Sequence, residues 1–82
     1  MNRSKIQLNI ISAEKKLFNG EVTSIVIPGI AGKFGVKPSH APLISPLQEG
    51  AIVYETEGKE ESLEVKGGVV EVNNNVVTIC VI

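Results

Sequence analysis

Residues 51–82 read AIVYETEGKEESLEVKGGVVEVNNNVVTICVI, and their apolar runs and turn signals decide the fold. The runs 51–56 and 59–66 flank the dipeptide Glu57-Gly58. This spacing is typical of a tight β-hairpin in which the glycine adopts a positive φ. We therefore predict two antiparallel strands joined by a two-residue turn.

A second hairpin follows after Gly67-Gly68, which bends the chain. The runs 69–72 and 76–82 flank Asn73-Asn74-Asn75, and asparagine tolerates the left-handed region that a tight turn needs. The final run is nearly all apolar. We therefore expect both of its faces to be covered.

The first half of the chain contains further short strands. Residues 6–12 alternate apolar and polar side chains, and residues 21–27 end at the turn signal Pro28-Gly29. Residues 33–36 favour a short strand, and Pro46 limits 43–47 to an edge strand. No stretch lacking Gly and Pro shows helical spacing. The prediction is an all-β domain over residues 1–82, an antiparallel β-sandwich of two packed sheets with short strands, or a barrel.

Composition excludes several classes of protein. The 82 residues include 8 basic and 9 acidic side chains, and the net charge of −1 provides no field to attract nucleic acid. Phe18, Phe34 and Tyr54 are the only aromatic residues, so we expect Phe18 and Phe34 in the core and no nucleic-acid partner. No run reaches the ~18 apolar residues of a membrane helix, so we expect no direct membrane insertion. Cys80 is the only cysteine; it favours a reducing compartment and packing as a small apolar side chain.

The residues for catalysis, metal binding and phosphate binding are also missing. His40 is the only histidine, and a catalytic triad on it and Ser39 is improbable because neighbours in an extended chain point to opposite sides. One Cys, one His and scattered Glu residues do not make a zinc site. The stretch 29–35, GIAGKFG, lacks the Ser or Thr and the helix of a phosphate-binding loop. We expect no catalytic residue, no metal and no cofactor.

The strongest candidate interaction surface is the stretch 39–46, SHAPLISP. Three prolines between Pro38 and Pro46 stiffen this segment and lower the entropy cost of holding it ready for a partner. Leu43 and Ile44 add apolar area. A stiff connector that buries both side chains explains the same residues, and composition alone does not separate these two interpretations.

The sequence resembles the N-terminal domain of the F-type ATP synthase epsilon subunit over almost its whole length. The matching stretches, in the family's order, are SAEKKLFNGEV (12–22), IPGIAGKFGV (27–36), KPSHAPLI (37–44), LQEG (47–50) and VKGGVVEVNNNVVT (65–78). The His-Ala-Pro-Leu and Gly-Gly-x-x-Glu-Val motifs are together highly specific. The resemblance implies two packed antiparallel sheets, in agreement with the strand pattern.

The resemblance also implies a function. It places the domain at the foot of the rotating central stalk, bound to the gamma subunit and to the polar loops of the c-ring. There it would couple proton-driven or sodium-driven rotation to ATP synthesis without itself being an enzyme. The implied gamma-contact residues are Ser12, His40, Ala41, Pro42, Leu43 and Ser45. The implied c-ring contact residues are Gly29, Ile30, Ala31, Gly32 and Lys33.

The sequence departs from its relatives at two places. Ala31 and Lys33 occupy positions that are often acidic in the c-ring loop, so the contact is either less electrostatic or matched by complementary charge. Most relatives continue into a pair of C-terminal helices that restrain ATP hydrolysis, whereas this sequence ends at Ile82. We therefore expect no inhibitory arm and no nucleotide binding.

The resemblance implies a peripheral location on the cytoplasmic face of a bacterial inner (plasma) membrane rather than a chloroplast thylakoid. The alternative function is a free-standing ligand-binding or interaction β-sandwich that shares the fold. A concave apolar pocket with convergent polar groups would favour that alternative.

Overall fold

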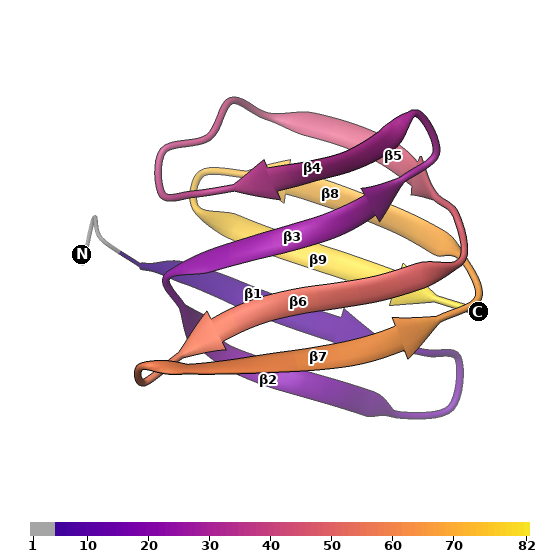
Figure 1. Ribbon diagram of the computed structural model, residues 1–82, viewed down its shortest axis with the longest axis horizontal. Helices are drawn as coiled ribbons and strands as arrows, with labels where there is room; N and C mark the ends of the chain where they lie inside the picture. Colours follow the sequence, from indigo (N-terminus) through magenta and orange to yellow (C-terminus); the bar gives the residue numbers. More distant parts are fainter. Residues whose placement is uncertain (1–4) are drawn as a thin grey trace.

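The computed structural model describes residues 5–82, which form nine β-strands and no helix (Figure 1). The strands are β1 (Ile6–Ile11), β2 (Lys16–Val22), β3 (Ser24–Gly29), β4 (Gly32–Val36), β5 (Leu43–Leu47), β6 (Gly50–Thr56), β7 (Lys59–Val65), β8 (Gly68–Asn73) and β9 (Val76–Val81). The predicted all-β class is confirmed. In these residues there is accordingly no helix that is long and apolar enough to cross a membrane.

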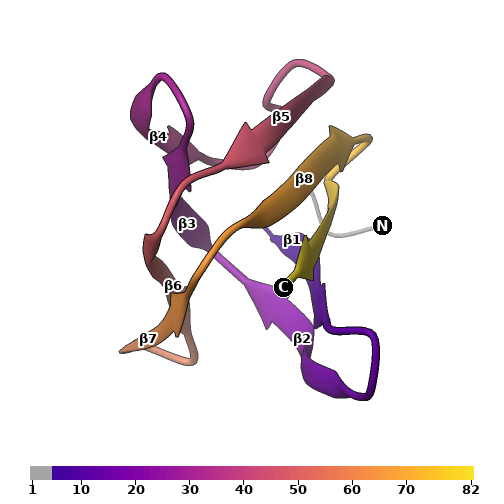
Figure 2. The same cartoon turned by 90° about the vertical axis from the view of Figure 1, so that its right-hand side faces the viewer.

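The strands form one continuous ladder in the order β2-β1-β9-β8-β5-β3-β6-β7, with β4 paired to β3. This ladder folds over on itself, so that the strands surround the core when viewed end-on (Figure 2). The predicted sandwich is thus built from one bent sheet. All pairs are antiparallel except β1 and β9, which run parallel with Gln7 opposite Val76. This parallel pair was not predicted, because β1 and β9 come from opposite ends of the chain and no hairpin links them.

Both predicted hairpins are present, and Glu57 adopts a positive φ that glutamate rarely takes. Glu57 and Gly58 have φ of 53° and 76°, and Asn74 and Asn75 have φ of 51° and 62°. Positive φ at both central residues is the type I′ turn, whose twist matches that of the flanking strands. Turn residues therefore determined these two strand pairings.

The core lies between the two halves of the bent sheet and is apolar throughout. Strand β1 shows the pattern, because Ile6, Leu8 and Ile10 are fully buried while the residues between them are half-buried. Phe18 and Phe34 are half-buried against this core, close to the prediction, and the Phe18 and Tyr54 ring centroids lie 4.5 Å apart. The buried set is Ile6, Leu8, Ile10, Val22, Ile25, Ile27, Val36, Leu47, Ile52, Val65, Val70, Val72, Val77 and Ile79.

Three strand predictions were wrong. Residues 43–47 do not form an edge strand, because β5 lies between β8 and β3 in the ladder and Leu47 pairs with Gly29. Strand β2 was not expected to begin at Lys16, because KLFNG lacks β-branched residues; the predicted run 21–27 is in fact split at Thr23 between β2 and β3. Strand β9 is covered on one face only. Val77 and Ile79 are buried there, whereas Val76 and Cys80 are exposed, so Cys80 does not pack in the core.

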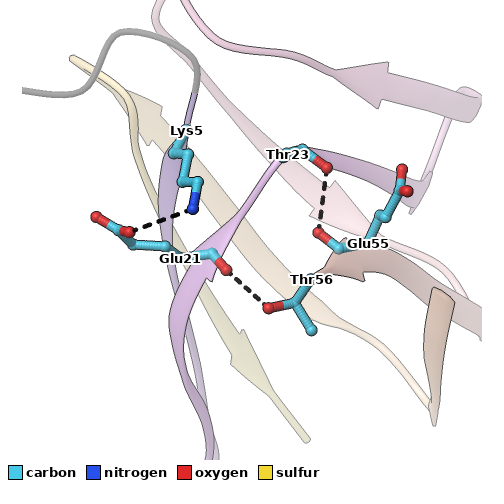
Figure 3. Close-up of polar contacts among 5 residues, drawn as sticks. All are labelled: Lys5, Glu21, Thr23, Glu55 and Thr56. Atoms are coloured by element: carbon cyan, nitrogen blue, oxygen red, sulfur yellow. Dashed lines mark hydrogen bonds and ion pairs between the residues drawn. The ribbon is translucent and has the colours of Figure 1, made fainter. Parts of the chain in front are cut away.

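The bent sheet closes at one end through the chain around Thr23 (Figure 3). The backbone N–H of Thr23 donates to the Glu55 carbonyl oxygen at 2.9 Å, and the Thr56 hydroxyl donates to the Glu21 carbonyl oxygen at 3.0 Å. The exposed Lys5–Glu21 ion pair, at 4.0 Å, adds little in water. We call this the Thr23 end, and the opposite end of the strands, where β1 finishes, the Ser12 end.

Candidate interaction surfaces

The 37–42 loop connects β4 to β5 at the Thr23 end. The His40 N–H donates to the Lys37 carbonyl oxygen at 3.1 Å, which closes a turn with Pro38 and Ser39 at its centre. Ser39 has a φ of 71°. Proline followed by a residue with positive φ is the type II arrangement, in which glycine is usual at the second position. The loop therefore has a defined shape, and it holds Ser39 in a conformation that serine rarely adopts.

The predicted gamma-contact residues of this loop lie at the surface. Ala41 and Pro42 are exposed and His40 is half-buried. Nδ1 of His40 lies 2.7 Å from the Ala41 carbonyl oxygen, which fixes the ring by a local contact. The His40 ring is thus engaged with the backbone of its own loop.

Strand β5 separates the remaining predicted residues by face. Leu43 lies opposite Val72 and Ser45 opposite Val70, and both partners are buried, so Leu43 and Ser45 face inward. Ile44, between them, is 73% exposed. The exposed apolar side chain of this segment is therefore Ile44. The sequence offered Leu43 and Ile44 together and could not tell which is exposed, because the face of each residue depends on the strand register.

Ser12 lies far from the 37–42 loop. Asn75, which contacts this loop, is beside Gln7, so five residues of extended chain, about 17 Å, separate that point from Ser12. The Ser12 hydroxyl oxygen accepts from the N–H groups of Glu14 and Lys15, both at 3.3 Å. Ser12 thus stabilises the β1–β2 turn. The structure does not bring it together with His40.

The predicted c-ring residues form the turn between β3 and β4 at the Ser12 end. Ile30, Ala31, Gly32 and Lys33 are exposed, whereas Gly29 is buried against Phe34. A two-residue turn between antiparallel strands has no helix that could receive a phosphate group. The phosphate-loop interpretation is therefore excluded for this segment.

Hydrogen bonds from neighbouring strands hold this turn in place. The Ile30 N–H donates to the Pro46 carbonyl oxygen at 3.0 Å. The Gln48 side chain donates to the Gly29 carbonyl oxygen at 2.9 Å, and the Gln48 N–H to that of Pro28 at 2.9 Å. These hydrogen bonds fix the base of the turn, while its tip is exposed.

Sequence reasoning missed an apolar row on the outer face of the sheet. Pro46 pairs with Val69, Val69 with Cys80, and Cys80 with Ile11, which places these four residues side by side on adjacent strands. Val69 is 41% exposed, Cys80 and Pro46 are exposed, and Ile11 is half-buried. Each residue was visible as an apolar position in its own strand, but only the register of four strands brings them together.

Two hollows of the described surface have walls of mixed polar and apolar side chains. One of about 590 Å³ lies beside the Thr23 end, with Lys5, Glu21 and Glu57 in its wall. Another of about 370 Å³ lies between the 37–42 loop and the β8–β9 turn. Neither is the apolar pocket that the ligand-binding alternative requires. Within residues 5–82, no three His, Cys or carboxylate side chains gather as metal ligands would.

Residues 5–82 match the family described as ATP synthase, Delta/Epsilon chain, beta-sandwich domain. The chain belongs to this family. Among the delta/epsilon relatives, the ATP synthase epsilon chain of Leptospira interrogans is 40% identical over 96% of this chain. That of Xanthomonas euvesicatoria is 44% identical over 95%. The chain spans 62% and 56% of the length of these two relatives.

Two solved structures contain chains with a similar fold. A chain in the cryo-EM structure of the Euglena gracilis mitochondrial ATP synthase, OSCP/F1/c-ring, aligns with a TM-score of 0.89 and 27% identity, over 95% of this chain and 51% of that one. A chain of the Tetrahymena thermophila mitochondrial ATP synthase central stalk and c-ring aligns with a TM-score of 0.79 and 13% identity, over 100% of this chain and 66% of that one. The second likeness concerns the fold alone.

Proposed function

We propose that this protein is the non-catalytic epsilon subunit of a rotary F-type ATP synthase. In this proposal it binds the gamma subunit and the polar loops of the c-ring, and it couples proton-driven or sodium-driven rotation to ATP synthesis. Its place is at the cytoplasmic face of a bacterial inner membrane as a peripheral subunit. Family membership and the bacterial relatives support this assignment.

The observation that carries the proposal is the separation of two exposed segments. The 37–42 loop lies at the Thr23 end and the β3–β4 turn at the Ser12 end, joined by the full length of β4 (Figure 1). A coupling subunit has to bind two partners at once, and these two segments give each partner a contact of its own at opposite ends of the domain. Here the loop would contact gamma, and Ile30, Ala31, Gly32 and Lys33 would contact the c-ring.

The outer apolar row supports gamma binding and gives Ser12 a place in it. The row from Pro46 to Ile11 runs across the face between Ile44 and Ser12. It borders the β3–β4 turn, where the Pro46 carbonyl oxygen accepts from the Ile30 N–H, so the gamma and c-ring contacts would be neighbours there. A single partner that covers this face and the adjacent loop would reach all three regions. Leu43 and Ser45 would then contribute by holding β5 in position, and His40, Pro42 and Ile44 by direct contact.

Gamma binding is tested with the double variant His40→Ala/Ile44→Ala, with the exposed Lys59→Ala on the β6–β7 hairpin as the control. If the two side chains anchor gamma, the Kd of the double variant rises by about tenfold or more, equivalent to about 1.4 kcal/mol. Lys59→Ala leaves the Kd unchanged. An unaltered Kd for a folded double variant would refute the gamma contact.

The c-ring contact is tested with Lys33→Glu in the assembled enzyme. An exposed charge at an interface mainly alters the association rate and its salt dependence. We expect the salt dependence of coupled proton pumping to change while the melting temperature of the protein stays constant. Identical salt profiles, or a lowered melting temperature, would count against the placement of Lys33.

A further inference from the structure

Asn75 links three segments at the Thr23 end. It is the second residue of the β8–β9 turn, with a φ of 62°, and its side chain is half-buried. Its carbonyl oxygen accepts from the Gln7 N–H at 2.9 Å, and its side-chain Oδ1 accepts from the Ser39 N–H at 2.6 Å. The turn, the start of β1 and the 37–42 loop therefore meet at one residue.

The hydrogen bond from Ser39 falls at the point where the loop needs support. Ser39 is exposed and has a φ of 71°, so its backbone occupies a region that a serine leaves readily. The other turn bond, from His40 N–H to the Lys37 carbonyl oxygen, lies within the loop and does not tie it to the sheet. Asn75 Oδ1 is thus the side chain that connects the centre of this turn to the body of the domain.

We propose that Asn75 is a positioning residue that holds the 37–42 loop in the shape presented to the gamma subunit. The inference rests on the proposed function and adds a residue that neither the motif nor the loop itself identifies. If the loop is held in its binding conformation, most molecules are ready to bind gamma. The apparent Kd for gamma increases as the fraction of such molecules falls. Asn75 therefore acts through Ser39 and His40 and needs no gamma contact of its own.

The test uses the 82-residue chain with Asn75→Gly, Asn75→Asp and Asn74→Gly. Asn75→Gly removes the acceptor and leaves an Asn-Gly pair, which a type I′ turn favours, so the hairpin is retained. Asn75→Asp keeps an oxygen acceptor on a side chain that tolerates positive φ. Asn74→Gly is the matched control in the same turn. The readouts are the hydrogen-exchange rate of the Ser39 amide by NMR and the Kd for gamma.

We expect Asn75→Gly to accelerate Ser39 exchange by about tenfold and to raise the Kd for gamma by about two- to tenfold, the range of one lost hydrogen bond. We expect Asn75→Asp to restore both values and Asn74→Gly to change neither. Unchanged Ser39 exchange in Asn75→Gly, failure of Asn75→Asp to restore it, or an equal effect of Asn74→Gly would overturn the inference.

The gamma measurement separates this inference from the function on which it rests. If Asn75→Gly accelerates exchange without altering the Kd, while His40→Ala/Ile44→Ala still weakens binding, the positioning role is wrong and the gamma contact stands. If the double variant also binds normally, the gamma contact itself is refuted, and the positioning role with it.

Discussion

At the scale of single residues, Gly68 occupies a position where no larger residue fits. A Cβ atom built there would lie 2.0 Å from the Cys80 carbonyl oxygen, and Gly68 has a φ of 146°. The adjacent Gly67 has a similar φ of 156°, but the nearest atom to its Cβ would be 3.5 Å away. Gly67 and Gly68 thus have similar φ values, but only Gly68 lacks the space for a Cβ atom.

We therefore expect Gly68→Ala to lower the free energy of unfolding by about 3 kcal/mol or more, since the β8–β9 ladder has to open to relieve the clash. Gly67→Ala should cost about 1–2 kcal/mol from backbone strain alone. Urea unfolding of both variants measures the difference. Equal losses would show that strain, and not the approach of β9, determines the need for glycine at position 68.

Ionisation of Tyr54 makes the free energy of unfolding depend on pH in the alkaline range. Burial of the ring, and secondarily the negative charge of Glu61 opposite it, raise the pKa of the Tyr54 hydroxyl above its ordinary value of 10.0. A group whose pKa is raised by folding stabilises the folded state below its unfolded pKa. That contribution is lost as the pH rises through the folded pKa.

The protein should therefore lose part of its stability as the pH rises above 10, the pKa of the unfolded tyrosine. Tyr54→Phe removes the titrating group and should flatten this part of the profile. Free energies of unfolding at pH 8 to 11 for both proteins provide the comparison. Parallel profiles would mean that Tyr54 titrates normally.

At the scale of elements, consecutive residues of β5 lie on opposite faces of the sheet. Leu43 packs against the core, whereas the adjacent Ile44 is mostly exposed. Leu43→Ala should lower the free energy of unfolding by about 1–3 kcal/mol, less than a fully buried leucine would cost. Ile44→Ala should change it by no more than about 0.5 kcal/mol. Thermal or urea unfolding checks both values, and the reverse order would show that the β5 register is wrong.

The elements were predictable where turn residues determine them. Gly58, Asn74 and Asn75 indicate their hairpins because these residues tolerate positive φ, and all three adopt it. The start of strand β2 was not predicted, because residues 16–20 contain no β-branched side chain. Pairing with β1 stabilises their extended conformation instead. The exposed face of β9 was missed for a related reason: an apolar run does not tell which of its faces has a neighbour.

The candidate surfaces were predictable in part. The motif residues of the 37–42 loop and the β3–β4 turn are mostly exposed, as an interaction surface requires. Sequence order alone could not show that Leu43 faces inward, that Ser12 lies at the far end, or that Ile11, Cys80 and Val69 are neighbours. These facts depend on strand register, which arises from pairing between distant segments.

At the scale of the whole molecule, the sheet has central and edge strands of different expected stability. Strands β1, β8 and β9 are paired on both sides, whereas β7 pairs only with β6 and β4 only with β3. Amides of the central strands should exchange only by global unfolding, and those of β4 and β7 by local opening at lower free energy. Native-state hydrogen exchange tests this order. Stronger protection in β7 than in β9 would contradict it.

The joint between the first and last strands also determines how the molecule responds to mechanical force. Because β1 and β9 run parallel, the start of β1 and the end of β9 lie at opposite ends of their ladder. Tension between Ile6 and Val81 would slide these strands past each other and load the ladder in shear, so its hydrogen bonds would break together. A hairpin such as β6–β7, pulled apart from its open end, would unzip one pair at a time. A molecule held by the two ends of its chain would therefore resist force where its first and last strands meet, and its hairpins would carry load only after that ladder had failed.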